Sequence, residues 1–208
     1  MTKLILTAAV SALVVGAAVP ALAQSKGDIL VGVGVGYVSP SSDNGTINIG
    51  SGDLDLDVGD DIQPTLTLEY FVMDNIGIEV LAATPFSHDI KIAGDKLAST
   101  KQLPPTISVQ YHIPTGTAFT PLVGIGVNYT TFWDEDLKGA LNSADLSLGD
   151  SWGVALHAGV DYAISDAGSV RADVRWVDLD STVKVNGDKV GTAEIDPWVF
   201  GLSYIFKF

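Results

Sequence analysis

Three histidines are the side chains best suited to acid–base chemistry, and the sequence gives them no catalytic partners. His88 falls in a long connection, whereas His112 and His157 fall within different alternating segments. His157 and Asp161 share a strand face, but about 13 Å of extended chain separates them, so they cannot pair directly. Neither a G-x-S-x-G elbow nor an H-E-x-x-H motif is present. The sequence therefore predicts no enzyme, with a lipid-A-modifying hydrolase as the alternative because such a site is assembled in space.

One acidic segment has a spacing that cation sites use. The stretch SGDLDLDVGDD carries Asp53, Asp55, Asp57, Asp60 and Asp61. Alternate aspartates beside glycines can ligate Ca²⁺, but these positions do not match an EF-hand loop and lack its terminal glutamate. Two alternatives stay open: divalent ions that bridge the segment to lipopolysaccharide phosphates, and a solvated acidic loop without metal. For the whole chain we predict no metal and no cofactor.

The start of the chain has the pattern of an export signal. Lys3 supplies a positive charge, residues 4–19 supply an apolar core, and Ala21-Leu22-Ala23 supplies a small-residue cleavage site. This predicts a signal peptide at 1–23, with a short membrane anchor as the alternative. Residues 24–208 suffice for one domain, and none of their apolar runs approaches the ~18 residues of a spanning helix. They hold 10 basic and 25 acidic residues, and this net charge of −15 excludes nucleic acid as a partner.

Period-two alternation of large apolar with small or polar residues recurs eight times after the cleavage site. The segments are 29–38, 64–73, 76–85, 107–113, 121–133, 152–164, 170–176 and 198–208. Short connections at 74–75, 114–118 and 165–168 alternate with long ones at 40–62, 86–104, 134–150 and 181–194. This predicts an all-β fold: an eight-stranded antiparallel up-and-down transmembrane β-barrel with short periplasmic turns and long extracellular loops. The last strand is expected to pair with the first.

The smaller and more polar face of each segment is predicted to point into the barrel. Eight strands leave an interior only wide enough for side chains, and the many glycines of this face suit such an interior. Its charges have both signs, so they can neutralise one another by pairing. The predicted lining of the interior is Leu81, Glu69, Glu79, Gln110, His112, Asn128, His157, Arg171, Asp173 and Arg175.

Aromatic residues on the opposite, apolar face indicate which solvent that face meets. Near the long connections lie Trp133, Trp152, Trp176 and Trp198. Near the short turns lie Tyr70, Tyr111, Tyr162, Tyr204, Phe206 and Phe208. Two aromatic belts around an aliphatic band are typical of a barrel in a bilayer. A soluble, lipocalin-like carrier is the alternative, and it would bury these aromatic side chains.

Five stretches of the sequence together resemble the OmpW family of Gram-negative outer-membrane proteins. They are DNIGIEVLAATPFSHDI (74–90), LPPTISVQYHI (103–113), PLVGIGVNYTTFWD (121–134), LSLGDSWGVALHAGVDY (146–162) and DPWVFGLSYIFKF (196–208). The resemblance implies an outer-membrane barrel whose narrow, largely apolar channel passes small hydrophobic molecules, which leave through the barrel wall into the lipid or periplasm. It also implies that Leu81 lies at an apolar constriction. Arg175 departs from the family, which often has an aromatic there, and could instead close the lower channel by pairing with Glu79 or Asp173.

Two features of the sequence predict openings in the barrel. Pro104 and Pro105 cannot donate ladder hydrogen bonds, so the stretch from Leu103 to Thr106 is predicted to border an opening or mouth for apolar solutes. A stiff start to the next strand is the alternative. Leu54 and Leu56 alternate within the acidic segment and are predicted to line the external mouth.

We therefore predict a passive outer-membrane channel for small hydrophobic molecules. The alternative is a structural or surface-interaction barrel with a plugged interior, whose long loops contact lipopolysaccharide, phage or host. A connected apolar path past Leu81 would favour transport. A continuous ion-pair plug would favour the alternative, and its predicted members are Glu69, Glu79, Arg171, Asp173 and Arg175. Predicted partners are outer-membrane lipids, lipopolysaccharide and small hydrophobic solutes. The aromatic terminal strand adds the barrel-assembly machinery by resemblance to outer-membrane proteins generally, and a homo-oligomer stays open.

Overall fold

The described part of the protein is built from strands and turns. A computed structural model describes residues 24–50, 52–137 and 144–208, and the predicted signal peptide at 1–23 lies outside these residues. Throughout the described ranges there is no helix. The described residues therefore form no helix that is long and apolar enough to cross a membrane.

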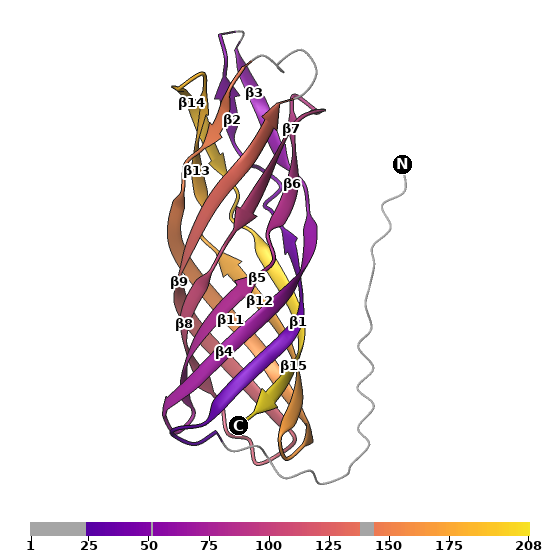
Figure 1. The fold of residues 1–208 in the computed structure, drawn as a ribbon, viewed down its shortest axis with the longest axis vertical. Helices are drawn as coiled ribbons and strands as arrows, with labels where there is room; N and C mark the ends of the chain where they lie inside the picture. The colour runs from indigo at the N-terminus through magenta and orange to yellow at the C-terminus, as the bar shows by residue number, and fades with distance from the viewer. Residues whose placement is uncertain (1–23, 51, 138–143) are drawn as a thin grey trace.

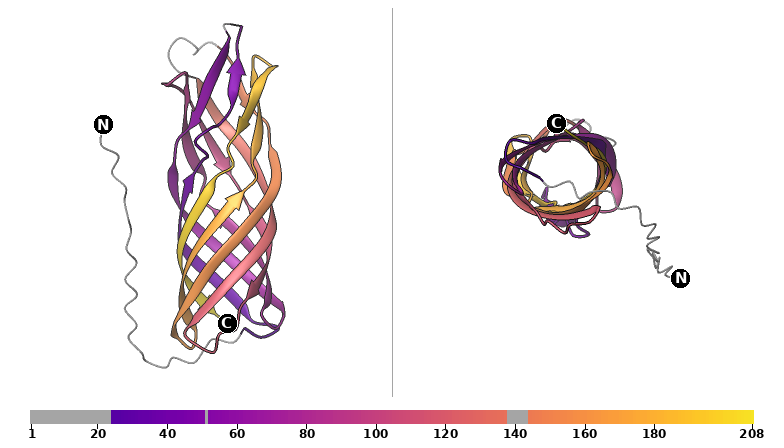
Figure 2. Two further views of the ribbon diagram at one scale, coloured as in Figure 1. Left: turned by 180° about the vertical axis from the view of Figure 1, so that it is seen from behind. Right: turned by 90° about the horizontal axis from the view of Figure 1, so that it is seen from below.

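Eight strands close into a barrel (Figure 1). They are β1 (Ile29–Ser39), β4 (Asp61–Met73), β5 (Ile76–Ala83), β8 (Thr106–His112), β9 (Phe119–Leu137), β11 (Ser151–Ser165), β12 (Gly168–Val177) and β15 (Trp198–Lys207). Each pairs antiparallel with the next, and β15 pairs back with β1, so the ring has no free edge. The end-on view in Figure 2 shows this closed ring. Each strand overlaps one predicted segment, which confirms the predicted barrel.

The end of the chain closes the ring. The β1–β15 register runs from Leu30 opposite Lys207 to Ser39 opposite Trp198. Ile29 donates its backbone N–H to the Phe208 carbonyl at 3.2 Å, and Phe208 donates back to Ile29 at 2.9 Å. The last residue is therefore held by two backbone hydrogen bonds, and the expected pairing of the last strand with the first is confirmed.

The outward face of the barrel is apolar and exposed. Its middle is aliphatic, with Leu66, Leu68, Ile107, Ile125 and Leu202 all about half exposed. Trp152 is 72% exposed and packs against Tyr129 with the two rings tilted, at 4.7 Å between ring centroids. An indole so exposed is favourable at a membrane interface, where its ring meets lipid and its N–H meets water. Trp133 lies higher than predicted, on the upper part of β9 opposite Lys101, because β9 continues beyond the barrel proper.

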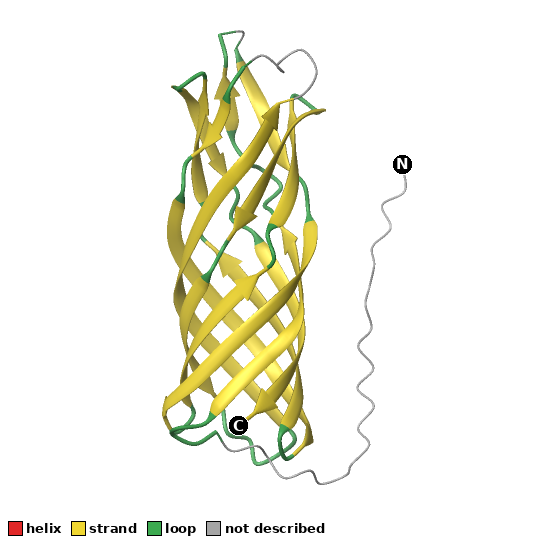
Figure 3. Ribbon diagram, in the orientation of Figure 1, coloured by secondary structure: helices red, strands yellow, loops and turns green. Residues whose placement is uncertain are grey.

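The long connections are mostly strands, contrary to the prediction of loops. They form β2 (Thr46–Asn48), β3 (Asp53–Val58), β6 (Phe86–Ile92), β7 (Asp95–Leu103), β10 (Leu146–Leu148), β13 (Asp180–Val185) and β14 (Asp188–Glu194). From β9 the pairing order is β7, β6, β3, β2, β14, β13 and β10. These strands lengthen the barrel upward, as Figure 3 shows. We call them, with the upper part of β9, the extension.

The hairpin turns explain why the connections fold in this way. Ala93-Gly94 and Asn186-Gly187 join β6 to β7 and β13 to β14, and all four residues have positive φ. Two such residues in succession are what a type I′ hairpin turn requires, and the flanking residues alternate between apolar and polar. The inward faces of the extension strands form the largest buried apolar cluster among the described residues, which includes Ile47, Leu56 and Ile90.

Candidate functional site

A network of buried charges centred on Arg171 fills the lower lumen of the barrel. Arg171 donates to both oxygens of Asp161, from Nε to Oδ1 at 2.7 Å and from Nη2 to Oδ2 at 2.9 Å. It also donates from Nη1 to Glu79 Oε2 at 2.9 Å and from Nη2 to Glu69 Oε2 at 3.4 Å. All four side chains are at most 4% exposed. Because β5 lies across the ring from β12, Arg171 ties opposite walls together.

Arg175 forms the upper layer of this network. It donates from Nη2 to Glu79 Oε1 at 2.8 Å and from Nε to Asp173 Oδ2 at 3.3 Å. Asp173 also contacts His157, with Nε2 3.2 Å from Oδ2. Arg175 thus contacts both of the carboxylates that the sequence suggested as its partners, and it caps the charged lumen on the side of the extension.

The lower end of the network meets an apolar floor. His112 Nε2 lies 2.8 Å from Glu69 Oε1, and the Phe71 ring packs edge-on against His112 at 5.0 Å. Phe71 belongs to a buried cluster with Leu30 and Ile205. Gln110, fully buried on β8, completes the inward face beside His112. The charged layers and this floor together close the barrel axis.

Two glycines make room for the charged network. A Cβ on Gly77 would lie 2.2 Å from Glu69 Oε1, and a Cβ on Gly201 would lie 2.3 Å from Asp173 Oδ1. Any other residue at these positions would push a carboxylate away from its guanidinium. The glycines of the inward face are therefore part of what lets the ion pairs form.

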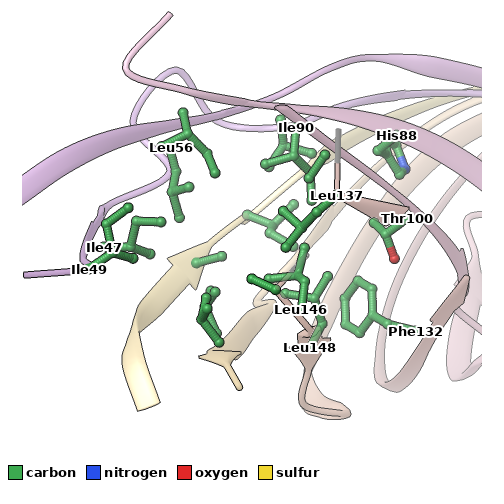
Figure 4. A pocket seen from close by; sticks show the side chains of 18 of the residues that line it. Ile47, Ile49, Leu56, His88, Ile90, Thr100, Phe132, Leu137, Leu146 and Leu148 are labelled. Atoms are coloured by element: carbon green, nitrogen blue, oxygen red, sulfur yellow. The ribbon is translucent and has the colours of Figure 1, made fainter. Parts of the chain in front are cut away.

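Above the charged lumen, the extension encloses an apolar cavity of about 230 Å³ (Figure 4). Its walls are mainly aliphatic side chains from every part of the extension, together with Phe132 of β9. The labelled members in Figure 4 are Ile47, Ile49, Leu56, His88, Ile90, Thr100, Phe132, Leu137, Leu146 and Leu148. This cavity can bind an apolar molecule by burial of its surface.

One end of the cavity is polar. His88 and Thr100 lie there, close to Phe132 (Figure 4). His88 Nδ1 is 2.6 Å from the Gly59 carbonyl oxygen, and His88 Nε2 is 2.9 Å from Gln102 Nε2. Burial lowers the pKa of His88 from its ordinary value of 6.5, so the ring is neutral near pH 7. His88 was predicted to lie in a loop, but the structure places it on β6, facing inward.

A second, smaller space, which we call the neck, lies between the cavity and the top of the charged lumen, and Gln102 lines both the neck and the cavity. Gln102 and Phe86 border it on the cavity side, and Arg175 borders it on the lumen side. Leu81 lines the same space, whose open volume is only about 40 Å³. The residue implied to form an apolar constriction thus stands where the apolar and charged regions meet.

Asn128 is held firmly beside the neck. Its Nδ2 donates to the carbonyl oxygens of Pro104 and Pro105 at 3.1 and 3.3 Å and to Thr106 Oγ1 at 3.0 Å. Its Oδ1 accepts from Thr130 Oγ1 at 2.7 Å. Asn128 therefore fixes the two prolines and borders the neck as a satisfied polar group.

The barrel wall loses its ladder beside the neck. Pairing of β5 with β8 ends at Leu81 opposite Thr106, and pairing of β6 with β7 resumes at Phe86 opposite Gln102. The intervening residues 82–85 and 103–105 thus face each other between two ladders. On the other side of the prolines the wall stays bonded, because Tyr129 donates its N–H to the Pro105 carbonyl at 3.1 Å. Tyr129 packs against Trp152, so this interruption lies at the level of the upper aromatic belt.

The acidic segment is split among separate contacts. Asp57 pairs with Lys91 at 3.1 Å, and Asp60 accepts from the Tyr37 hydroxyl at 2.5 Å. Within the described residues, no three His, Asp or Glu side chains are grouped to hold a metal ion. Leu56 of the same segment lines the cavity, while Leu54 packs against the apolar cluster. The apolar residues of this alternating segment therefore contribute to the wall of the cavity and to the apolar cluster around it.

Most of the cavity residues were missed from the sequence. Ile47, Ile90 and Leu146 sit in connections that were interpreted as loops. The alternating run FSHDIKI, with its first, third, fifth and seventh residues buried, is the signal that could have identified β6.

Comparisons with known proteins agree with this geometry. The OmpW family profile matches residues 25–208. Outer membrane protein W of Vibrio cholerae serotype O1 is 41% identical over 203 residues, covering 91% of this chain and 92% of that protein. The crystal structure of OprG from Pseudomonas aeruginosa has a TM-score of 0.80 at 34% identity, covering 90% of this chain and 99% of that one. The solid-state NMR structure of AlkL in lipid bilayers has a TM-score of 0.70 at 26% identity, covering 89% and 92%.

Proposed function

Because the chain belongs to the OmpW family of outer-membrane proteins, we propose that it is a passive channel that carries small hydrophobic molecules from the cell exterior into the outer membrane. The barrel lies among outer-membrane lipids and lipopolysaccharide. It acts by binding and geometry, without catalysis. The observation that carries this proposal is the apolar cavity of about 230 Å³ that lies directly above a sealed, charged lumen.

The route through the protein leaves the barrel axis at the neck. An apolar solute that moved further down would have to separate Arg171 and Arg175 from their carboxylates, which are buried and would lose their partners. Beside the neck, residues 82–85 and 103–105 lie between two ladders, so fewer backbone hydrogen bonds oppose a lateral opening there. The solute therefore passes Leu81 and Pro104 into the outer leaflet.

Flux through vesicles tests the route. The vesicles carry lipopolysaccharide in the outer leaflet, and uptake of naphthalene is compared with uptake of the charged naphthalene-2-sulfonate. We expect uptake of naphthalene only, and we expect Leu81→Trp to remove most of it by filling the neck. The matched control is Val80→Trp, the same change at the neighbouring residue that faces lipid. Equal uptake by the Leu81→Trp and Val80→Trp barrels would refute the route.

The two prolines allow a separate test of the lateral opening. Pro104→Ala and Pro105→Ala each restore a backbone donor at the interruption, so we expect slower naphthalene uptake with unchanged binding in the cavity. Uptake that matches the native barrel would leave the prolines as a stiff start to β8 and would remove the opening from the proposal.

The sealed lumen is the observation that favours the second candidate function, a structural or surface-interaction barrel. In that case the apolar cavity stabilises the extension, and no solute passes. Complete absence of naphthalene uptake by the native barrel, with the protein correctly inserted, would favour this candidate.

Biogenesis is part of the proposal. A signal peptide at residues 1–23 is cleaved before Gln24, and the barrel-assembly machinery reads the aromatic terminal strand. Deletion of Phe208 removes the two backbone hydrogen bonds to Ile29 but leaves the β1–β15 ladder from Leu30 onward. We therefore expect it to lower insertion into the outer membrane in cells more than it lowers stability of the refolded barrel.

A further inference from the structure

The polar end of the cavity has a fixed direction of hydrogen bonding. A carbonyl oxygen can only accept, so His88 Nδ1, 2.6 Å from the Gly59 oxygen, must carry the ring proton. His88 Nε2 is therefore an acceptor, and the group 2.9 Å from it must be the NH₂ of Gln102. The contact to Gly59 thus decides which way the Gln102 amide points.

This direction leaves the amide oxygen of Gln102 unused. Gln102 is 2% exposed, and its Oε1 has no hydrogen-bond partner among the described residues. The residue lies between the cavity and the neck and lines both. A buried acceptor without a partner costs free energy, and a ligand that supplies a donor removes this cost.

The neighbouring hydroxyl, that of Thr100, can also act as a hydrogen-bond acceptor toward a ligand. Thr100 is 3% exposed, and its Oγ1 donates toward the carbonyl oxygens of Lys101 and Trp133, at 3.3 and 3.4 Å. A hydroxyl has one proton, so the remaining capacity of Thr100 is to accept. The polar end of the cavity therefore offers a ligand two acceptors, the unpartnered Gln102 Oε1 and the Thr100 hydroxyl oxygen, and the one further side-chain donor of these three residues is the second N–H of the Gln102 amide.

We propose that the polar end of the cavity, with Gln102 as the specificity-determining residue, selects apolar molecules that carry a single N–H or O–H donor over equally apolar molecules that carry only an acceptor. This inference rests on the proposed function, because it concerns the ligand of the same cavity. A site that must pair a buried acceptor discriminates against a ligand that brings a second acceptor. The size fits one bicyclic ring system, since an apolar cavity of about 150 Å³ holds benzene.

Indole and benzofuran form a suitable probe pair. They have nearly the same shape, but indole carries an N–H where benzofuran carries a ring oxygen. Binding is measured by calorimetry on the full barrel in lipid nanodiscs, with protein-free nanodiscs subtracted. We expect indole to bind about fivefold more tightly, which is the effect of one hydrogen bond. Equal affinities would overturn the inference and leave the proposed function intact, whereas absence of binding by both probes would overturn the proposed function as well.

A double variant locates the preference. In Gln102→Leu alone, the His88 Nε2 lone pair would be freed and could accept from indole in its place. His88→Phe together with Gln102→Leu removes both groups, so the affinities for indole and benzofuran should become equal. Benzofuran binding by the double variant shows that the cavity is still formed. The matched control is Gln63→Leu, which lies outside the cavity and neck and should keep the preference. Retention of the preference by the double variant would refute the role of Gln102.

Discussion

The lower lumen and the upper cavity are bounded by one continuous wall, yet their inward faces have opposite chemistry. β9 runs through both, and it presents Gly124 and Gly126 to the charged lumen but Phe132 to the cavity. Below, two guanidinium groups bind carboxylates from opposite walls. Above, the walls are aliphatic with one small polar end. The ion pairs of the charged half link opposite walls of the barrel, whereas the apolar half can bind an apolar ligand. Substitutions in the lower half should therefore change the free energy of unfolding, and substitutions in the upper half should change ligand binding.

The largest effect is expected from the centre of the charged lumen. Arg171→Met leaves Asp161, Glu79 and Glu69 buried without their shared guanidinium, which should cost about 3–5 kcal/mol in the free energy of unfolding. Urea unfolding of the barrel in phospholipid vesicles measures this. The control is Lys101→Met, which breaks the exposed pair with Asp134 and should change stability little. Similar losses in both variants would show that the lumen does not hold the barrel together.

A charge in the upper region should damage binding and leave the lower barrel intact. Ile90→Asp places a carboxylate in the cavity wall and loses the burial of an isoleucine, roughly 1.5–3 kcal/mol. We expect loss of naphthalene binding and faster proteolysis of the β6–β7 hairpin, with an unchanged unfolding midpoint for the strands below. The control Lys91→Asp introduces the same side chain at the neighbouring, outward position, where it also removes the exposed ion pair with Asp57, a loss of at most about 1 kcal/mol. If Ile90→Asp also lowers the stability of the lower strands, the two regions are not independent.

The lower barrel could be predicted from the sequence because a closed membrane barrel imposes a strict period of two. Lipid on one side and a narrow lumen on the other leave almost no freedom in which face each residue takes. The period-two alternation predicts which face of the wall a residue lies on, but it does not predict how high along the barrel axis the residue lies. Glu79 and Arg171 are 92 positions apart, and only the registers of the ring bring them to 2.9 Å. The sequence therefore named Glu69 and Glu79 as members of a possible ion-pair plug with Arg171, but it could not give the pairing or identify Asp161 as the bidentate partner.

The extension was harder to predict because its strands are short and its faces are mixed. β2 and β10 have three residues each, too few for an alternation to stand out. The acidic residues of β3 drew attention to cation binding, whereas the inward residue Leu56 carries the structural role. Asn186-Gly187 was a usable signal, because this dipeptide is a strong marker of a tight hairpin turn.

Acid should act on the upper region through His88, with a smaller effect than Ile90→Asp. Burial favours the neutral ring against the pull of Asp60, Asp61 and Asp89, so the pKa in the folded state is below the ordinary 6.5. The folded state then binds fewer protons than the unfolded chain. The contribution of the neutral His88 to the free energy of unfolding is therefore complete above pH 6.5 and is lost as the pH falls below that value. Hydrogen exchange of the β6–β7 hairpin at pH 7.5 and pH 5 measures this.

The same protonation should alter ligand preference. A charged ring donates from both nitrogens, so the Gln102 amide must turn its oxygen toward His88 and its NH₂ toward the cavity. We expect the advantage of indole over benzofuran to shrink at pH 5. A His88→Phe barrel is the control, and its hairpin exchange and ligand ratio should show no such titration. If the native ratio stays constant over the pH range in which the hairpin exchange of the native barrel, but not of the His88→Phe barrel, changes, His88 does not set the direction of the amide.

The smallest effect is expected from the ion pair at the lower rim, which separates burial from charge as the source of the lumen's strength. Lys207 Nζ lies 2.7 Å from Asp28 Oδ2, as close as the contacts of Arg171, but both side chains are about one-fifth exposed. Burial raises the pKa of Asp28, but hydrogen bonds from Lys207 and the Ser25 amide outweigh this and leave it below 3.8. The pair thus stabilises the barrel above pH 3.8, and its contribution is lost as the pH falls through the lowered pKa. Asp28→Asn should cost at most about 1 kcal/mol at pH 7 and less at pH 3 by urea unfolding. A loss at pH 7 as large as that of Arg171→Met would mean that any ion pair in this wall is equally important, and that the depth of the lumen has no part in holding the barrel closed.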